Sequence, residues 1–423
     1  MKKVITLLFA AAMASSPFAD TVQAVEEPNA PSDIEKKDVA EQEREENQTE
    51  EVNVLTLEDV LKRALENNQN LVVLQYELEA LKNQTLDVVD DKTDTQKDIK
   101  DLNKQLDKLK KERDRLTDAA SRIMNGQERI AINDAIEGLE DKITNLGQTI
   151  KKLESGQLQA GFQQEEVKAG ITLKLTSDYV NLLSLQKQMD FKKKEIQEAV
   201  KEVQRTDRRY QYGVASREEV DQAKKKQTNI EKQLEKQQNE YQYNLASLAF
   251  DIGIQYKPDL YITPMNLQIN KWIRMDDYKA VIDNTFKMKR AKEDLELAKF
   301  NRDEVYKDED SGEYAKQEQD YRVKSAEEKI TALYQELTPK IEALYHNVET
   351  TEFDYEESLR QLENVKEDMT ALEKRYRYGV VSKAEYEKAL FQLDQLVFNG
   401  EMLNIQNFLV HQSLSALKQG YIQ

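Results

Sequence analysis

Apolar side chains recur every three or four residues along most of this 423-residue chain, which is the spacing of an amphipathic α-helix. The first such segment starts at Thr56, a residue type that caps helices. The pattern breaks at residues 67–70, and a longer helix begins at about Leu71. The sequence therefore predicts a short helix followed directly by a long one.

The most regular spacing lies within residues 95–154, where the apolar positions form two coiled-coil seams. Asn and Gly within residues 124–127 predict a tight reversal between two antiparallel arms. Each arm of about 28 residues would be about 40 Å long. The seam positions are Ile99, Leu102, Leu106, Leu109, Leu116, Ala120 and Ile123 in the first arm, and Ile132, Ile136, Leu139, Ile143, Leu146, Ile150 and Leu153 in the second.

After this hairpin, Ser155, Gly156 and Gly161 predict a loosened chain. A helix of nearly 70 Å is expected from about residue 164 to residue 211. A turn and a returning helix follow, and two prolines mark residues 256–273 as a connector.

The stretch RRYQYGVASREEVDQA at 208–223 returns as KRYRYGVVSKAEYEKA at 374–389. Residues 274–301 also repeat, in weaker form, the pattern that begins at Thr56. An internal duplication is therefore predicted. The sequence favours an all-α fold of long antiparallel helical hairpins in two repeats, residues 54–255 and 274–420.

The two repeats differ in length. The first contains the coiled-coil hairpin 95–154, whereas the second has only a short charged turn near residues 308–313. We expect the hairpin to be an insertion that folds by itself, because its two seams satisfy each other.

The repeated motif predicts a helix–turn–helix reversal. A glycine, Gly213 or Gly379, can end a helix with a positive φ angle. The pattern S-x-x-E then follows and completes a capping box for the next helix. Its residues are Ser216 and Glu219 in the first copy and Ser382 and Glu385 in the second.

The residues before each glycine share two further properties. Arginine, Arg209 or Arg375, places positive charge at a helix C-terminus, where it is favourable. Tyrosines are expected to brace the turn. They are Tyr210 and Tyr212 in the first copy, and Tyr376 and Tyr378 in the second.

Composition narrows the possible functions. Only 12 glycines and 6 prolines are too few for the many turns of compact β or α/β domains, and a net charge of −18 argues against nucleic acid as a partner. The chain contains no cysteine, no nucleotide-binding glycine motif and no zinc-protease motif, so we expect no enzyme activity, cofactor or metal. His346 lies near Glu342 and Glu349, but one histidine among scattered acids predicts no metal site. His411 is expected to be packed.

Residues 1–24 have the pattern of a Sec signal peptide, with two lysines, a short apolar core and small residues before a cleavage point after Ala24. Residues 25–53 are strongly acidic and almost free of apolar side chains, which predicts a disordered leader. No later stretch approaches the length of a membrane-spanning helix. We expect an exported protein that does not insert in a bilayer.

The repeated motif resembles a known family. The pattern R-Y-x-x-G-x-x-S-x-x-[DE]-V-x-x-A occurs twice, with Tyr386 replacing the usual aliphatic residue in the second copy. The opening LTLEDVLKRALENN at 55–68 is similar to the opening of TolC-type outer-membrane efflux proteins. The resemblance covers about residues 54–420, and these three stretches are its specific parts.

The resemblance implies a trimeric helical tunnel that works with a membrane-fusion (adaptor) protein and an inner-membrane transporter. In that family the two turns contact the adaptor and form the closing aperture. It therefore implies that the two turns bind the partner. The residues concerned are Arg209, Tyr210, Gly213, Ser216 and Glu219 in the first turn, and Arg375, Tyr376, Gly379, Ser382 and Glu385 in the second.

One feature departs from the family. Family members carry two β-strands in each repeat, and three chains close these strands into an outer-membrane barrel. Here the hairpin 95–154 and the turn near residues 308–313 occupy those positions, and neither has alternating apolar strands. We expect a TolC-like helical body without a β-barrel, which favours the surface or wall of a cell lacking an outer membrane over the outer membrane that the resemblance implies.

Two hypotheses remain open from the sequence. In the first, the protein is an exported component of an efflux or secretion system that forms or docks to a trans-envelope duct through its turns. In the second, the same helices form an extracytoplasmic structural protein that spaces or tethers envelope components. Gln227 and Gln237, polar residues in the seam of the returning helix, favour the wet interior that a duct needs.

Overall fold

The computed structural model describes residues 54–267, 269, 274–275, 277–308 and 311–423. The predicted signal peptide and acidic leader, residues 1–53, lie outside the described residues, as does part of the predicted connector.

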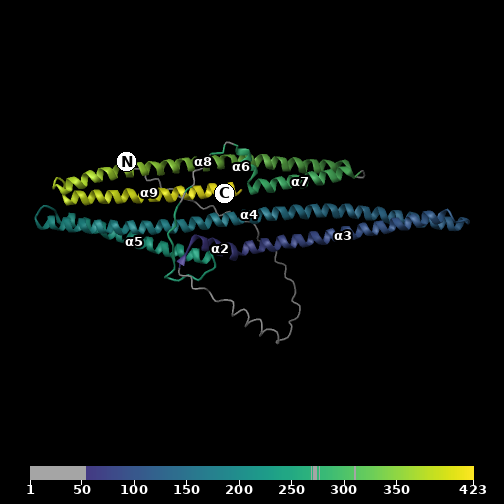
Figure 1. Ribbon diagram of the computed structural model, residues 1–423, viewed down its shortest axis with the longest axis horizontal. Helices are drawn as coiled ribbons and strands as arrows, with labels where there is room; N and C mark the ends of the chain where they lie inside the picture. Colours follow the sequence, from purple (N-terminus) through teal and green to yellow (C-terminus); the bar gives the residue numbers. More distant parts are fainter. Residues whose placement is uncertain (1–53, 268, 270–273, 276, 309–310) are drawn as a thin grey trace, which may run out of the picture. The chain divides into compact units, whose positions relative to one another are not determined.

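Long helices dominate the described chain and run beside one another (Figure 1), which confirms the all-α fold class. The first half contains α2 (Leu57–Asn67), α3 (Gln69–Arg113), α4 (Ala119–Gln211) and α5 (Arg217–Asp251). The second half contains α6 (Tyr278–Asp283), α7 (Phe286–Lys307), α8 (Glu313–Arg377) and α9 (Lys383–Lys418).

The starts of both halves are built alike. Thr56 caps α2 with a complete capping box, and Asn68 caps α3 immediately after, which confirms the predicted break. In the second half the short helix α6 is followed by α7, whose N-cap is Thr285. Each half thus begins with a short helix, and a capping residue then starts a longer helix.

A small parallel sheet, which the sequence did not predict, joins the segment just before α2 to the connector. β1 (Val54–Leu55) pairs with β2 (Tyr261–Ile262). The fully buried Tyr179 of α4 places its hydroxyl 3.0 Å from the carbonyl oxygen of Leu55 and 2.7 Å from that of Thr263. The sheet therefore rests on α4.

Each half has its own apolar core. In the first half, Leu182 of α4 and Leu245 of α5 are buried in one cluster with residues of α2 and the sheet. In the second, Leu337 and Ile341 of α8 are buried against α6 and α9. Smaller contacts between α4 and α9 join the two, with Val180, Ile405 and Phe408 at their centre.

The predicted reversal at residues 124–127 is wrong. α3 ends at Arg113 and α4 begins at Ala119, where the side chain of Asp118 accepts a hydrogen bond from the N–H of Ser121 (2.8 Å). Asn125 lies inside α4 and is buried, and its amide donates to the carbonyl oxygen of Leu109 (3.0 Å). This contact with α3 stabilises Asn125 within the helix α4, so the Asn-Gly pair forms no turn.

The predicted loosening at residues 155–161 is also wrong, because α4 continues unbroken for 93 residues. Ser155 is fully buried and Gly156 lies against Leu81 of α3. Gln157 donates to the hydroxyl of Thr85 (2.5 Å). The small residues let α3 and α4 approach closely instead of breaking the helix.

The helical hairpin is therefore continuous with the helices on either side, and its register differs from the predicted one. Gly147 lies against Lys92, and Gly156 lies against Leu81. Residue 95 thus faces about residue 144 of α4, not residue 154.

Among the described residues, no helix is long and apolar enough to cross a membrane.

Candidate docking site at the two helical turns

The turn between α4 and α5 follows from local chemistry. Gly213 has a φ angle of +71°, and its N–H donates to the carbonyl oxygen of Tyr210 (2.9 Å). The N–H of Val214 donates to the carbonyl oxygen of Arg209 (2.8 Å). These two bonds form a Schellman motif, which satisfies the last carbonyl groups of α4.

The next helix is started by the predicted capping box. The N–H of Ser216 donates to the carboxylate of Glu219 (2.6 Å), and the N–H of Glu219 donates to the hydroxyl of Ser216 (3.2 Å). Both predictions for this turn, the left-handed glycine and the capping box, are confirmed.

The turn between α8 and α9 repeats this geometry. Gly379 has a φ angle of +75°, and its N–H donates to the carbonyl oxygen of Tyr376 (2.9 Å). The N–H of Ser382 donates to the carboxylate of Glu385 (3.0 Å), and the N–H of Glu385 donates to the hydroxyl of Ser382 (3.2 Å). The two copies of the motif thus form the same turn.

The prediction that four tyrosines brace the turns is wrong for the two nearest the glycines. Tyr212 and Tyr378 expose 82% and 85% of their surface, and Val214 and Val380 each expose 67%. These residues lie between the end of one helix and the start of the next. Each turn therefore presents an uncovered aromatic and an uncovered aliphatic side chain.

Tyr376 does brace its turn, through a contact that the sequence did not predict. Its ring stacks on that of Tyr386, with ring centroids 4.7 Å apart and planes 4° apart. Tyr386 is the residue at which the second copy departs from the family pattern. Because of this departure, the second turn gains an aromatic stack between its two helices.

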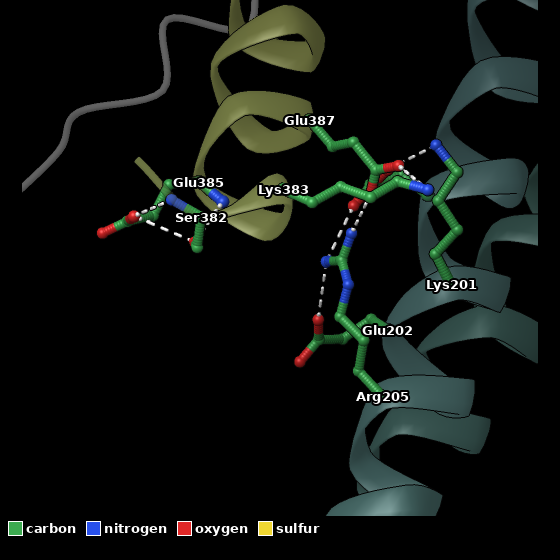
Figure 2. A network of polar contacts seen from close by, with 8 residues as sticks. Lys201, Glu202, Arg205, Ser382, Lys383, Glu385 and Glu387 are labelled. Carbon is green, nitrogen blue, oxygen red and sulfur yellow. Dashed lines mark hydrogen bonds and ion pairs between the residues drawn. The ribbon is translucent and has the colours of Figure 1, made fainter. Parts of the chain in front are cut away.

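An ion-pair network joins the two turns. Arg205 of α4 pairs with Glu198 and Glu202 of its own helix. It also reaches Glu387 of α9 (Figure 2). The distance from Arg205 Nη2 to Glu387 Oε2 is 2.9 Å. Since Arg205 and Glu387 stand eight residues from Gly213 and Gly379 respectively, this contact places the two turns side by side.

Further contacts extend this alignment along α4 and α9. Phe191 stacks on Phe398, with centroids 4.4 Å apart, and lies 5.9 Å from the ring of Phe391. Lys194 pairs with Asp394 (2.8 Å). The two helices therefore run antiparallel and hold the turns in a fixed mutual register.

The carboxylates of the turns are held in their charged form. Hydrogen bonds from the backbone N–H groups of Ser216 and Ser382 lower the pKa of Glu219 and of Glu385 below the ordinary value. A hydrogen bond from Arg205 lowers the pKa of Glu387. At neutral pH these groups are therefore anionic and accept the hydrogen bonds that cap α5 and α9 and that link α4 to α9.

Sequence reasoning missed the residues that connect the turns, namely Arg205, Glu387 and the three phenylalanines. One signal was available, because Arg205 and Glu387 lie at equal distances from their glycines. This offset identifies a pair only once α4 and α9 are known to be neighbours.

The two histidines lie elsewhere. Glu342 and Glu349, which stand near His346 in the sequence, both pair with Arg274 (2.7 and 3.1 Å). His411 is packed as expected, with its Nε2 atom 3.1 Å from Glu352, and burial lowers its pKa. Among the described residues, no group of three or more potential ligands could hold a metal ion.

The sequence matches no protein-family model and no curated protein. The fold, in contrast, is similar to those of solved membrane proteins. A membrane protein from Pseudomonas aeruginosa has a TM-score of 0.55, 11% identity, and matches 86% of this chain and 93% of its own. The outer-membrane channel OprN has a TM-score of 0.54 and 11% identity over 86% and 90% of the two chains. The open state of the Neisseria gonorrhoeae outer membrane channel MtrE has a TM-score of 0.52 and 12% identity over 86% and 89%. The predicted TolC-like helical fold is confirmed.

Proposed function

We propose that the protein is an exported component of an efflux or secretion system, and that its two turns dock to an adaptor protein that works with an inner-membrane transporter. The fold it shares with outer-membrane channels supports a place in such a system. The chain itself supplies no catalysis in this proposal. Three copies assemble around a common axis to form the export duct.

The observation that carries the proposal is the pair of matched turns. Both have the same Schellman motif and capping box, and the Arg205–Glu387 contact holds them side by side. A turn that served only to reverse the chain would need no partner of identical shape. Two equal turns in fixed register form a surface that one partner can grip at two equivalent points.

The uncovered side chains of the turns supply the contact surface. Tyr212, Val214, Tyr378 and Val380 contribute little to the fold, because they are largely exposed. Aromatic side chains of this kind are enriched at protein interfaces. They therefore allow the docking surface to be altered without damage to the helices.

The experiment replaces Tyr212, Val214, Tyr378 and Val380 together with serine, in cells whose chromosomal gene is deleted. Accumulation of a fluorescent efflux dye and the protein content of the culture medium are measured. We expect export to fall to the level of the deletion strain, while the helical circular dichroism spectrum and the melting temperature of the purified variant stay unchanged.

A matched control replaces four exposed aromatic residues away from the turns, Tyr243, Phe250, Tyr314 and Tyr321, with serine. This control should export at the wild-type rate. If deletion stops export but the turn variant still exports normally, the turns do not dock. If deletion alters the spacing of the envelope layers in electron micrographs and leaves export intact, the protein is a tether.

A further inference from the structure

The end of the α3–α4 hairpin lies beyond the neighbouring ends of α7 and α8 (Figure 1). Gln159 of α4 donates to Asp294 of α7 (2.6 Å), so these two residues lie side by side and give a common point from which the lengths of the two helices can be compared. From that point α7 continues for 13 residues to Lys307, whereas α4 extends 40 residues to Ala119. At 1.5 Å per residue the hairpin reaches about 40 Å farther than α7.

We call residues 104–130 the hairpin end, and its charge is opposite to that of the whole chain. It contains eight Lys or Arg residues and five Asp or Glu residues, a net charge of +3, whereas the chain carries −18. Two of the bases pair with acids of α3, Lys104 with Asp101 and Lys110 with Asp107.

Other bases of the hairpin end are free to bind a partner. Lys108, Lys111, Arg113 and Arg115 are exposed, and within the described chain none of them has a carboxylate partner. They lie in the last turns of α3 and in the reversal itself. A positive field therefore surrounds the extremity of an otherwise acidic protein.

The same region exposes apolar side chains. Ile123, Met124 and Ile130 each expose between 61% and 64% of their surface. Ile123 and Ile130 are seven residues apart and so share one face of α4. The seam toward α3 is formed by other residues, such as Ile132 and Ile136, which are partly buried. The exposed apolar residues are thus not needed to hold the hairpin together.

We propose that the hairpin end binds the surface of an anionic lipid bilayer. Basic side chains are attracted to acidic headgroups, and apolar side chains beside them enter the boundary between headgroups and acyl chains. The charge disfavours a second copy of this chain as the occupant, because two ends of +3 repel each other. A soluble polyanion would leave the apolar residues exposed to water.

The contact is peripheral, since only side chains of the hairpin end reach the bilayer. It is independent of the docking function proposed for the turns, which lie at the opposite end of α4. A protein anchored in this way is held at one end by lipid and remains free at the other end to bind a partner.

The test is flotation of the purified full-length chain with vesicles of phosphatidylcholine alone, or mixed with an equal amount of phosphatidylglycerol. The wild type should float with the anionic vesicles only, and less so as salt is raised. Lys111→Glu with Arg115→Glu should weaken binding at least about tenfold. Ile123→Ser with Ile130→Ser should weaken it about tenfold as well.

Matched controls make the same changes on α5, where Lys224→Glu with Lys225→Glu carries the same charge change and Tyr243→Ser with Phe250→Ser removes other exposed apolar groups. Both should bind anionic vesicles like the wild type. Equal loss in the α5 charge variant would show that net charge alone decides binding, and would overturn the proposal.

Two other results would also overturn it. If the isoleucine variant still binds vesicles at full strength, the hairpin end is a site for any polyanion. If that variant instead loses self-association in light scattering with unchanged vesicle binding, the apolar face belongs to a second copy. Circular dichroism confirms that each variant is folded before it is compared.

Discussion

The two ends of the helical hairpins differ in how closely the two repeats agree. At one end the turns at Gly213 and Gly379 share φ angles, capping boxes and exposed side chains, and an ion pair joins them. At the other end α3 and α4 form a long basic extension, while α7 ends at Lys307 and α8 begins at Glu313, after a short acidic stretch of sequence. The two repeats therefore keep the same local structure at the first end and differ in length and in charge at the second.

The largest effect is expected where the two repeats pack together. Phe191→Ala removes the stack with Phe398 and Phe391, which should lower the free energy of unfolding by about 3–4 kcal/mol. Ile136→Ala in the hairpin should cost less, because only two helices surround it. Chemical denaturation gives the free energies, and hydrogen exchange should show loosening near residue 191 in the first variant and only in the hairpin in the second. Equal and global effects would contradict the comparison.

A smaller effect is expected when the link between the turns is cut. Arg205→Met removes the partner that Glu198 and Glu387 share, and should lower the free energy of unfolding much less than Phe191→Ala, because ion pairs open to water are screened. The distribution of distances between spin labels at positions 212 and 378, measured by electron paramagnetic resonance, should become broader. Lys104→Met is the matched control, since it breaks only one exposed pair, and it should change neither quantity.

Lowering the pH should weaken the capping boxes of the two turns and the Arg205–Glu387 ion pair. Because the pKa values of Glu219, Glu385 and Glu387 are lowered in the folded protein, their stabilisation is full above the ordinary pKa of about 4.3 and is lost as pH falls through the lowered values. Amide protection factors, which correct hydrogen exchange for the intrinsic rate, should be lower near pH 3 than near pH 7 at residues 216–219 and 382–385. Glu219→Gln with Glu385→Gln keeps a capping side chain without the charge, so this variant should lose most of the acid effect.

The smallest effect on the stability of the remaining protein is expected from deleting the outer part of the hairpin, with the cut made between residues that face each other on α3 and α4. Deleting residues 95–144 and joining the ends with a short linker leaves Lys92 beside Gly147 and should preserve the helicity and cooperative melting of the remainder. Deleting residues 95–154 instead leaves residues 82–94 of α3 without their partners on α4, and should fray them. If both deletions unfold the whole protein in circular dichroism, the extension is not separable.

Local chemistry explains which features the sequence could predict. The glycine and the S-x-x-E pattern act on bonds within a few residues, so both turns, the caps at Thr56 and the all-α fold were correctly predicted. The reversal was misplaced because Asn125 can favour a turn or a helix, and its bond to Leu109 decides for the helix. That contact joins two helices and is not visible in the local sequence.

The contacts that align the turns are also tertiary. Arg205 and Glu387 are separated by 182 residues, and their pairing depends on the register of α4 against α9. The position of Tyr212 and Tyr378 just before the glycines predicts that they brace the turns, yet both side chains are largely exposed. The sequence therefore located the candidate site, and the structure supplied its assembly and its exposed surface.

The docking role of the turns can be tested most directly at their two glycines. A Cβ atom at Gly213 or Gly379 would meet open space, so a substitution acts only through the positive φ angle. Valine there should cost about 1–2 kcal/mol per turn, whereas asparagine tolerates the left-handed conformation better. We predict that Gly213→Val with Gly379→Val abolishes export with only a small fall in melting temperature, and that the double asparagine variant exports normally. A folded double valine variant that exports at the wild-type rate, in cells where deletion of the gene stops export, would contradict the account.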